Sequence, residues 1–215
     1  MTAILFDLDG TLVDTAPDLG LALNIQLERH GLQPLLHSQI RPAASHGTGA
    51  LLELGFNLKP ADNGFIEKRD EYLAIYDQVL ANAPVLFDGM AELLTMIENQ
   101  GLPWGIVTNK PKRFTVPMMR AMGLDQRAAC VISGDDAARA KPHPDTLLMA
   151  CDIIQKSATD CIYVGDAQRD IEAGIAAGMR TAVAMYGYLS VLDNPKEWGA
   201  DFLISQPQEI MDLIS

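Results

Sequence analysis

Two carboxylates stand two residues apart near the start of the sequence, at Asp7 and Asp9. They follow a short apolar run and precede Gly10 and Thr11, which suits a tight turn after a strand. In extended chain both side chains point to the same side and repel each other unless a cation or a proton lies between them. Such oxygen ligands suit Mg²⁺, and one carboxylate could act as nucleophile while the other acts as general acid and base. The alternative is a solvated turn with two surface acids.

Two further groups have the chemistry to bind phosphate. Thr108 and Asn109 follow a second apolar run, where a hydroxyl and backbone N–H groups before a helix can bind an anion. Lys141 precedes a proline and could present one fixed positive charge to a phosphoryl group and to Asp7. Taken alone, the first group is typical of a helix cap or turn, and the second of an exposed surface lysine.

Another pair of acids follows a later apolar run. Asp170 stands four residues after Asp166, so the two face the same side if the segment is helical. Asp166 could complete a metal site, and Asp170 could support either that site or Lys141 from behind. Taken alone, this pair is typical of a helix cap followed by a surface acid.

The surrounding pattern predicts an α/β fold with a doubly wound parallel sheet. Continuous apolar runs of the kind found in buried parallel strands occur at residues 3–8, 104–108, 130–133, 161–165, 181–184 and 202–205. Helix-like stretches alternate with them at about 88–100, 112–122, 144–155, 168–177 and 207–214. All four polar groups fall at the carboxyl ends of predicted strands, the edge where such sheets bind ligands. We therefore expect them to form one site.

Residues 16–83 break this alternation, because they show helical patterns and no convincing strand. A helix is expected from Ala16 to about Gly31, a second at about 48–56 and a third at about 63–80. We therefore expect a core of residues 1–15 and 84–215 and an inserted all-helical unit of residues 16–83.

Composition narrows the possible partners. The formal net charge of -12 argues against nucleic acid and anionic membranes, which select for basic patches. No run approaches the roughly 18 apolar residues needed to span a bilayer, and no signal-peptide pattern is present. Three cysteines without metal-ligand spacing suit a reducing compartment, so a cytoplasmic protein is expected.

In order, the four groups resemble the four motifs of the haloacid dehalogenase-type (HAD) hydrolase superfamily: D-x-D-G-T, then Thr or Ser, then Lys, then G-D-x-x-x-D. The resemblance implies a Rossmann-like core, a helical cap inserted after the first motif, and Mg²⁺ as cofactor. It also implies that Asp7 attacks phosphorus and that Asp9 protonates the leaving alcohol and then activates water. Asp7 and Asp166 would bind Mg²⁺ by side chain, and Asp9 by its backbone carbonyl. The phosphoryl oxygens would be held by Thr108, Asn109 and Lys141.

Within the superfamily the chain resembles the phosphoglycolate phosphatase group and, more narrowly, the N-acetylmuramic acid 6-phosphate phosphatases of cell-wall recycling. The residues that carry the narrower resemblance are 108–111, 113–114, 186–188, 194–195 and 198–201. It implies hydrolysis of a small phosphate monoester, with N-acetylmuramic acid 6-phosphate as the expected substrate and 2-phosphoglycolate as the alternative. A phosphomutase with the same residues and a non-catalytic phosphate-binding module are the other classes considered. Substrate contacts are expected in the cap from Arg41, Ser45 and His46, with Arg41 as a partner for a substrate carboxylate.

Overall fold

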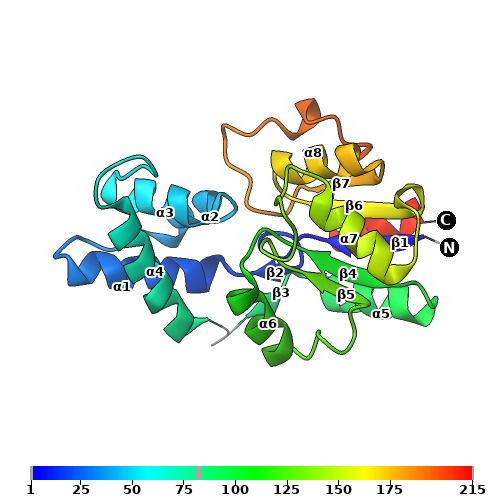
Figure 1. The fold of residues 1–215 in the computed structure, drawn as a ribbon, viewed down its shortest axis with the longest axis horizontal. Coiled ribbons are helices and arrows are strands. Elements are labelled where there is room, and N and C mark those ends of the chain that lie inside the picture. Colours follow the sequence, from blue (N-terminus) through cyan, green and yellow to red (C-terminus); the bar gives the residue numbers. More distant parts are fainter. Residues whose placement is uncertain (1, 81–83, 215) are drawn as a thin grey trace.

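The computed structural model describes residues 2–80 and 84–214 and contains a six-stranded parallel sheet (Figure 1). In order across the sheet the strands are β5 (Cys130–Ile132), β4 (Trp104–Val107), β1 (Ala3–Phe6), β6 (Cys161–Gly165), β7 (Arg180–Ala184) and β8 (Phe202–Ile204). All five neighbouring pairs are parallel. The predicted α/β fold class is confirmed, and each predicted core strand is present.

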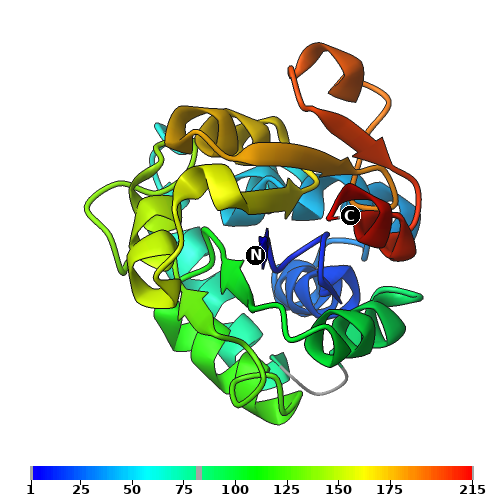
Figure 2. The same cartoon turned by 90° about the vertical axis from the view of Figure 1, so that its right-hand side faces the viewer.

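Helices cover both faces of the sheet (Figure 2). In β1, Ile4 and Phe6 belong to one buried cluster, whereas Ala3 and Leu5 belong to the other, because successive side chains of a strand point to opposite faces. On the first face lie α5 (Met90–Asn99), α6 (Lys112–Ala121) and α9 (Ile210–Leu213); on the second lie α7 (Asp145–Ile154) and α8 (Gln168–Ala177). Short 3-10 turns occur at Ala158–Asp160, Pro195–Glu197 and Pro207–Glu209. Burial on both faces explains why the strands read as continuous apolar runs.

Four helices pack together beyond the carboxyl ends of the strands (Figure 1). They are α1 (Ala16–Arg29), α2 (His37–Ala44), α3 (Gly47–Phe56) and α4 (Phe65–Val79), and α1 contacts the other three. Helix α1 has Pro17 in its first turn and buries Leu19, Leu23 and Leu27, which recur at helical spacing. Helix α2 is not among the helices expected from the sequence, because it has only eight residues and contains Pro42.

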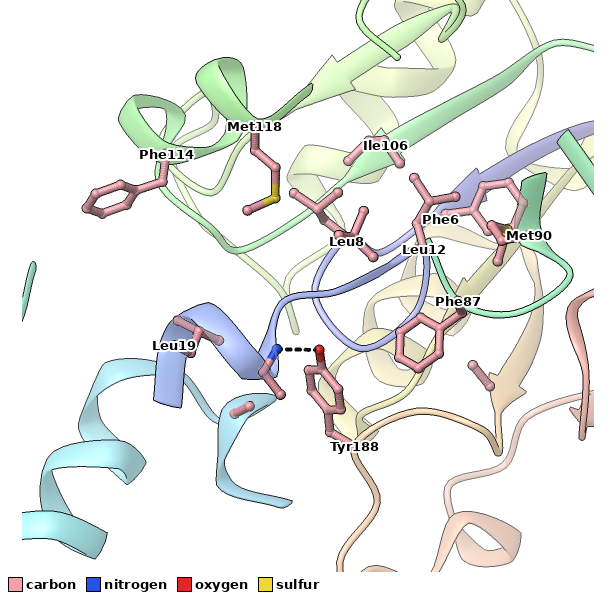
Figure 3. Close-up of a cluster of buried hydrophobic side chains, with 14 of the residues drawn as sticks. Phe6, Leu8, Leu12, Leu19, Phe87, Met90, Ile106, Phe114, Met118 and Tyr188 are labelled. Atoms are coloured by element: carbon pink, nitrogen blue, oxygen red, sulfur yellow. Dashed lines mark hydrogen bonds between the residues drawn. The ribbon is translucent and has the colours of Figure 1, made fainter. Parts of the chain in front are cut away.

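A two-stranded antiparallel ribbon joins the helices to the sheet. It pairs β2 (Val13–Asp14) with β3 (Val85–Leu86), and strands of two residues leave no periodic pattern to detect in the sequence. At the start of α1, the backbone N–H of Ala16 donates a hydrogen bond to the Tyr188 hydroxyl at 2.8 Å (Figure 3). Tyr188 lies in the loop after β7, so a residue of the core binds the first residue of α1. The predicted boundary after residue 83 adjoins residues 81–83, which lie outside the described residues.

None of the helices in the described part of the chain is both long enough and apolar enough to cross a membrane.

The central strands should account for much of the stability of the core. Ile162 in β6 is fully buried, so Ile162→Ala should lower the free energy of unfolding by about 2–5 kcal/mol through lost burial and a cavity. Ile153 in α7 is 53% exposed, and Ile153→Ala should change the free energy of unfolding by less than about 0.5 kcal/mol. Denaturant unfolding of both variants measures the difference, and equal losses would contradict this account of the core.

Candidate active site

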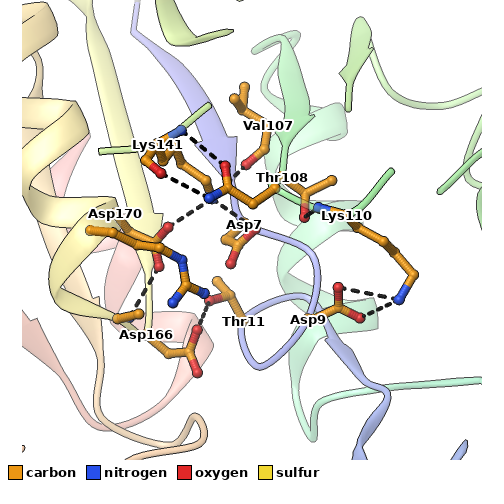
Figure 4. Close-up of polar contacts among 12 residues, drawn as sticks. Asp7, Asp9, Thr11, Val107, Thr108, Lys110, Lys141, Asp166 and Asp170 are labelled. Atoms are coloured by element: carbon orange, nitrogen blue, oxygen red, sulfur yellow. Dashed lines mark hydrogen bonds and ion pairs between the residues drawn. The ribbon is translucent and has the colours of Figure 1, made fainter. Parts of the chain in front are cut away.

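The polar groups expected to form one site meet at the carboxyl edge of the sheet (Figure 4). Asp7, Thr108 and Asp166 directly follow β1, β4 and β6, and β1 lies between the other two strands. Lys141 comes from the loop between β5 and α7, and Asp170 from the first turn of α8. The topology of the sheet therefore brings together residues that are more than 160 positions apart in the sequence.

Lys141 is buried between two carboxylates. Its Nζ lies 2.9 Å from Asp7 Oδ1 and 2.7 Å from Asp170 Oδ1. The same ammonium donates to the Val107 carbonyl at 3.1 Å and to the Tyr163 hydroxyl at 2.6 Å. Four oxygens thus fix one positive charge beside Asp7, and each carboxylate is partly neutralised by the same cation.

Burial and neighbouring charges shift the pKa values of the three acids differently. Burial raises the pKa of Asp7 although the Lys141 charge opposes it. Burial also opposes ionisation of Asp170, but the Lys141 ammonium and then the Arg169 guanidinium hold the pKa of Asp170 below its ordinary value. Burial, followed by the charges of Asp170 and Asp7, raises the pKa of Asp166 to about 7. Three buried acids thus lie close together, and burial opposes the ionisation of all three.

The three acids have the geometry of a cation site. Oxygens of Asp7, Asp166 and Asp170 lie within 4.8 Å of one another, and all three residues are buried. Carboxylate oxygens at this spacing suit a hard divalent cation, which would relieve their repulsion. The residues present fit Mg²⁺, as the motif resemblance implied.

Asp166 has several donors around its carboxylate. Its Oδ2 accepts hydrogen bonds from the Ser45 hydroxyl at 2.6 Å and from the Tyr188 backbone N–H at 2.9 Å. Its Oδ1 accepts one from the Thr11 hydroxyl at 3.3 Å. Ser45 follows α2, so the helical insert touches this acid directly.

Two glycines leave the space that Asp166 occupies. A Cβ at Gly10, whose φ is +86°, or at Gly187 would overlap the Asp166 side chain. Gly10 therefore provides the turn after the first motif and also permits the close approach of the two strand ends.

The side chain of Asp9 points to a different set of partners. It accepts hydrogen bonds from the Thr15 hydroxyl at 2.6 Å and from Lys110 Nζ at 3.0 Å. Among the described residues, the three-carboxylate cluster contains Asp170 rather than Asp9. The two carboxylates of the first motif therefore do not face one shared cation: Asp7 contacts Lys141, whereas Asp9 contacts Thr15 and Lys110.

The Thr-Asn pair also divides its tasks. Thr108 is buried and lines the cavity above Asp7. The amide of Asn109 donates to the Lys141 carbonyl at 2.9 Å and accepts from the Lys141 N–H at 3.0 Å. The Asn109 side chain therefore holds the Lys141 loop in place, and the contact of Asn109 with a phosphoryl oxygen stays a prediction.

A cavity of about 490 Å³ lies between the strand ends and the helical insert. The core contributes Asp7, Asp9, Thr108 and Lys110; the insert contributes Ser45, His46, Arg69, Tyr72 and Tyr76. Ser45 and His46, two of the residues expected to contact the substrate, thus line this cavity, and the cavity opens directly on Asp7.

Arg41 does not lie in this cavity. Its guanidinium lies 2.7 Å from Asp14 Oδ2 and 4.7 Å from the centre of the Tyr188 ring. It lines a second cavity, at the ribbon between β2 and β3. The Arg41 side chain is therefore bound at the junction of insert and core, away from the cavity that opens on Asp7, and its contact with a substrate carboxylate stays a prediction.

Several residues of the site were missed by the sequence analysis. Lys110 pairs with Asp9, Tyr163 accepts from Lys141, and Arg169 donates to the Ser45 carbonyl at 2.6 Å. Lys110 and Arg169 stand within the motifs, which was the available signal. Tyr163 lies inside an apolar strand, where nothing in the sequence distinguishes it from a core residue.

The fold and the site together define a class of protein. The family model for haloacid dehalogenase-like hydrolases matches residues 4–184, and the chain belongs to that family. A crystal structure of a predicted phosphoglycolate phosphatase from Haemophilus somnus superimposes with a TM-score of 0.86 at 25% identity, covering 100% of this chain and 98% of the other. The family predicted from the motifs is confirmed.

Two kinds of phosphatase are similar to this chain to the same degree. The N-acetylmuramic acid 6-phosphate phosphatase of Pseudomonas putida is 42% identical over 214 residues, covering 100% of this chain and 96% of the relative. The phosphoglycolate phosphatase of Xanthomonas campestris pv. campestris is 42% identical over 211 residues, covering 98% and 95%. These relatives support a phosphoric monoester hydrolase, and they do not distinguish between the two substrates.

Replacement of the buried Lys141 ammonium by an uncharged side chain should lower the free energy of unfolding strongly. Lys141→Met leaves Asp7 and Asp170 without their shared counter-charge, and loss of one partner of a buried pair typically costs about 3–5 kcal/mol. The additional change Asp170→Asn should restore part of this loss, because it removes one stranded carboxylate.

Denaturant unfolding without added metal measures these effects. The control is Lys112→Met, since the Lys112 side chain is 62% exposed and pairs only at the surface, with Asp136. A loss for Lys141→Met no larger than that for Lys112→Met would contradict the assigned role of the buried ammonium.

Proposed function

We propose that this protein is a Mg²⁺-dependent phosphatase that hydrolyses a small phosphate monoester through an aspartyl-phosphate on Asp7. The observation that carries the proposal is the position of Asp7: it is buried at the end of β1, lies 2.9 Å from the Lys141 ammonium and opens on the 490 Å³ cavity. A nucleophile beside a fixed positive charge suits attack on a phosphoryl group, whose transition state spreads negative charge over its oxygens.

The residues of the chain account for both halves of the reaction. An oxygen of Asp7 forms a bond to phosphorus while the bond from phosphorus to the ester oxygen breaks, and Asp9 gives its proton to the departing alcohol. Asp9 then takes a proton from water, whose oxygen attacks the phosphorus and releases inorganic phosphate from Asp7. Throughout, Lys141 and Thr108 stabilise the phosphoryl oxygens.

We assign the Mg²⁺ ligands to the side chains of Asp7 and Asp166 and to the backbone carbonyl of Asp9. The close spacing of the Asp7 and Asp166 carboxylates supports the two side-chain ligands, and the Asp9 carbonyl follows from the motif resemblance. When bound, the cation would neutralise charge on the phosphoryl group and hold it in line with Asp7. Asp170 acts indirectly, because its carboxylate fixes Lys141.

We further propose that residues 16–83 act as a cap over the core of residues 1–15 and 84–215. The Ser45 contact with Asp166 and the Arg169 contact with the Ser45 carbonyl support a cap that closes on the reacting groups. Closure would exclude bulk water from the phosphoryl group until hydrolysis is due.

The size and lining of the cavity favour a sugar phosphate over a two-carbon acid. A volume of about 490 Å³ is far larger than the glycolate portion of 2-phosphoglycolate requires, and the lining includes the aromatic residues Tyr72, Tyr76 and Phe114, as in a pocket for a larger organic group. We therefore favour N-acetylmuramic acid 6-phosphate, the substrate of the Pseudomonas putida relative, with 2-phosphoglycolate as the second candidate.

Phosphate release in the presence of Mg²⁺, compared for these two esters, tests the substrate. A higher kcat/KM for the sugar phosphate supports the proposal, whereas a higher value for 2-phosphoglycolate contradicts the cavity argument. Activity that requires a sugar bisphosphate and releases no phosphate would instead indicate a phosphomutase.

The two acids of the fourth motif should differ in their effect on the cation. Asp166→Ala removes a proposed ligand and should weaken Mg²⁺ binding more than about 100-fold, whereas Asp170→Ala should cost about 10-fold, as for residues that orient a site. Isothermal titration with Mg²⁺ alone gives the affinities, and the Mg²⁺ concentration for half-maximal activity provides the second readout. Equal losses in the two variants would refute the division of roles.

A further inference from the structure

Lys110 is a buried lysine that none of the motif roles includes. Its side chain is only 5% exposed, and its Nζ lies 3.0 Å and 3.3 Å from the two carboxylate oxygens of Asp9. The same Nζ donates to the Tyr76 hydroxyl at 2.7 Å. Figure 4 shows the ammonium directed at Asp9 and away from the cluster around Lys141.

The core fixes the backbone of Lys110. Its N–H donates to the Thr108 hydroxyl at 3.2 Å, and its carbonyl accepts from the Gly134 N–H at 3.0 Å and from the Thr115 hydroxyl at 3.2 Å. The lysine therefore extends from a rigid strand end, and the position of its ammonium is set by the same loop that carries Thr108.

The partner on the other side belongs to the proposed cap. Tyr76 is a buried residue of α4, and its ring packs at 5.2 Å between centroids against Phe114 of α6. The Lys110 ammonium also lies 4.8 Å from the centre of the Tyr76 ring, within reach of a cation–π contact. One lysine thus contacts both the acid of the first motif and a helix of the insert.

Asp9 is consequently held from two sides. Lys110 binds it from the core, and the Thr15 hydroxyl, which immediately precedes α1, donates to Asp9 Oδ1 at 2.6 Å. A buried ion pair contributes little net stability, since desolvation offsets the attraction, but it fixes the orientation of both groups. The structural consequence of Lys110 is therefore the placement of the Asp9 carboxylate.

We propose that Lys110 is a positioning residue that fixes the Asp9 carboxylate for proton transfer to the leaving group and, through Tyr76, makes that placement depend on α4 of the cap. The inference rests on the proposed phosphatase function and extends it. Lys110 needs no contact with the substrate in this role, which distinguishes it from Lys141 and Thr108.

Substituted phenyl phosphates provide the test, because they share one shape and differ in how much their leaving group needs a proton. A nitrophenolate departs without one, whereas unsubstituted or methoxy-substituted phenolates depend on the acid. The slope of log kcat/KM against leaving-group pKa, measured with Mg²⁺ present, reports proton donation in the step that forms the aspartyl-phosphate.

Lys110→Met should steepen this slope. We expect kcat/KM for phenyl phosphate to fall about 10²-fold, the lower range for loss of general acid catalysis, and that for p-nitrophenyl phosphate to fall less than about 5-fold. Lys110→Arg should recover part of the loss, since it keeps a cation next to Asp9. Lys112→Met, an exposed lysine two positions along the same segment, should leave the slope unchanged.

Tyr76→Phe keeps the charge of Lys110 and removes only the hydroxyl that contacts it. This variant should steepen the slope to a smaller extent, and its effect should vanish in the Lys110→Met background, because both changes act through one contact. If Lys110→Met does not fold, Tyr76→Phe and Lys110→Arg provide the test in its place.

The outcomes separate this inference from the function on which it rests. Suppose that the wild-type protein hydrolyses the series and that Lys110→Met, or Tyr76→Phe in its place, lowers kcat/KM equally for every ester. The positioning role is then overturned, and the proposed phosphatase function stands. If the wild-type protein releases phosphate from none of the esters, both proposals are wrong. A steeper slope that Lys110→Arg partly reverses supports the positioning role.

Discussion

The ammonium of Lys141, buried between Asp7 and Asp170, is the contact on which the rest of the site depends. A carboxylate as deeply buried as Asp7 is costly to ionise, and a nucleophile must be ionised to attack. The lysine opposes the cost of ionising Asp7, the proposed nucleophile, by placing a fixed cation against both acids. Tyr163 and the Val107 carbonyl in turn fix the lysine. Asn109 holds the backbone of the same loop, so a second-motif residue positions the third-motif charge.

The parallel sheet brings these groups together because neighbouring strands β4, β1 and β6 all end at one edge. The helical insert then completes the site from above, with Ser45 on Asp166 and Tyr76 on Lys110. Core and insert therefore contact each other at Asp166, a proposed metal ligand, and at Lys110, which binds Asp9. Such contacts would let closure of the cap and the arrangement of the reacting groups depend on each other.

Much of this arrangement could be predicted from the sequence. The apolar runs before Asp7, Thr108 and Asp166 indicate the strands, and the motif residues indicate which strand ends carry the polar groups. The sequence could not reveal α2, which is short and contains Pro42, or the two-residue strands β2 and β3, because these depend on tertiary contacts. Arg41 is an expected substrate contact by sequence, yet its side chain is bound by Asp14, and only the fold determines that pairing. Lys110 shows the opposite case: it stands beside Asn109 in the motif, but its role depends on Asp9 and Tyr76, which lie far away in sequence.

The central claim is that Asp7 carries the phosphoryl group during turnover. Rapid acid quenching of the protein during turnover, followed by proteolysis and mass spectrometry, tests this claim directly. Asp9→Asn should slow the hydrolysis step and thereby increase the amount of intermediate available for detection when an activated ester such as p-nitrophenyl phosphate is the substrate. The account predicts one added phosphoryl group on Asp7 and none in Asp7→Asn. Phosphate release with no phosphoryl group on Asp7, or with the group on another residue, would contradict it.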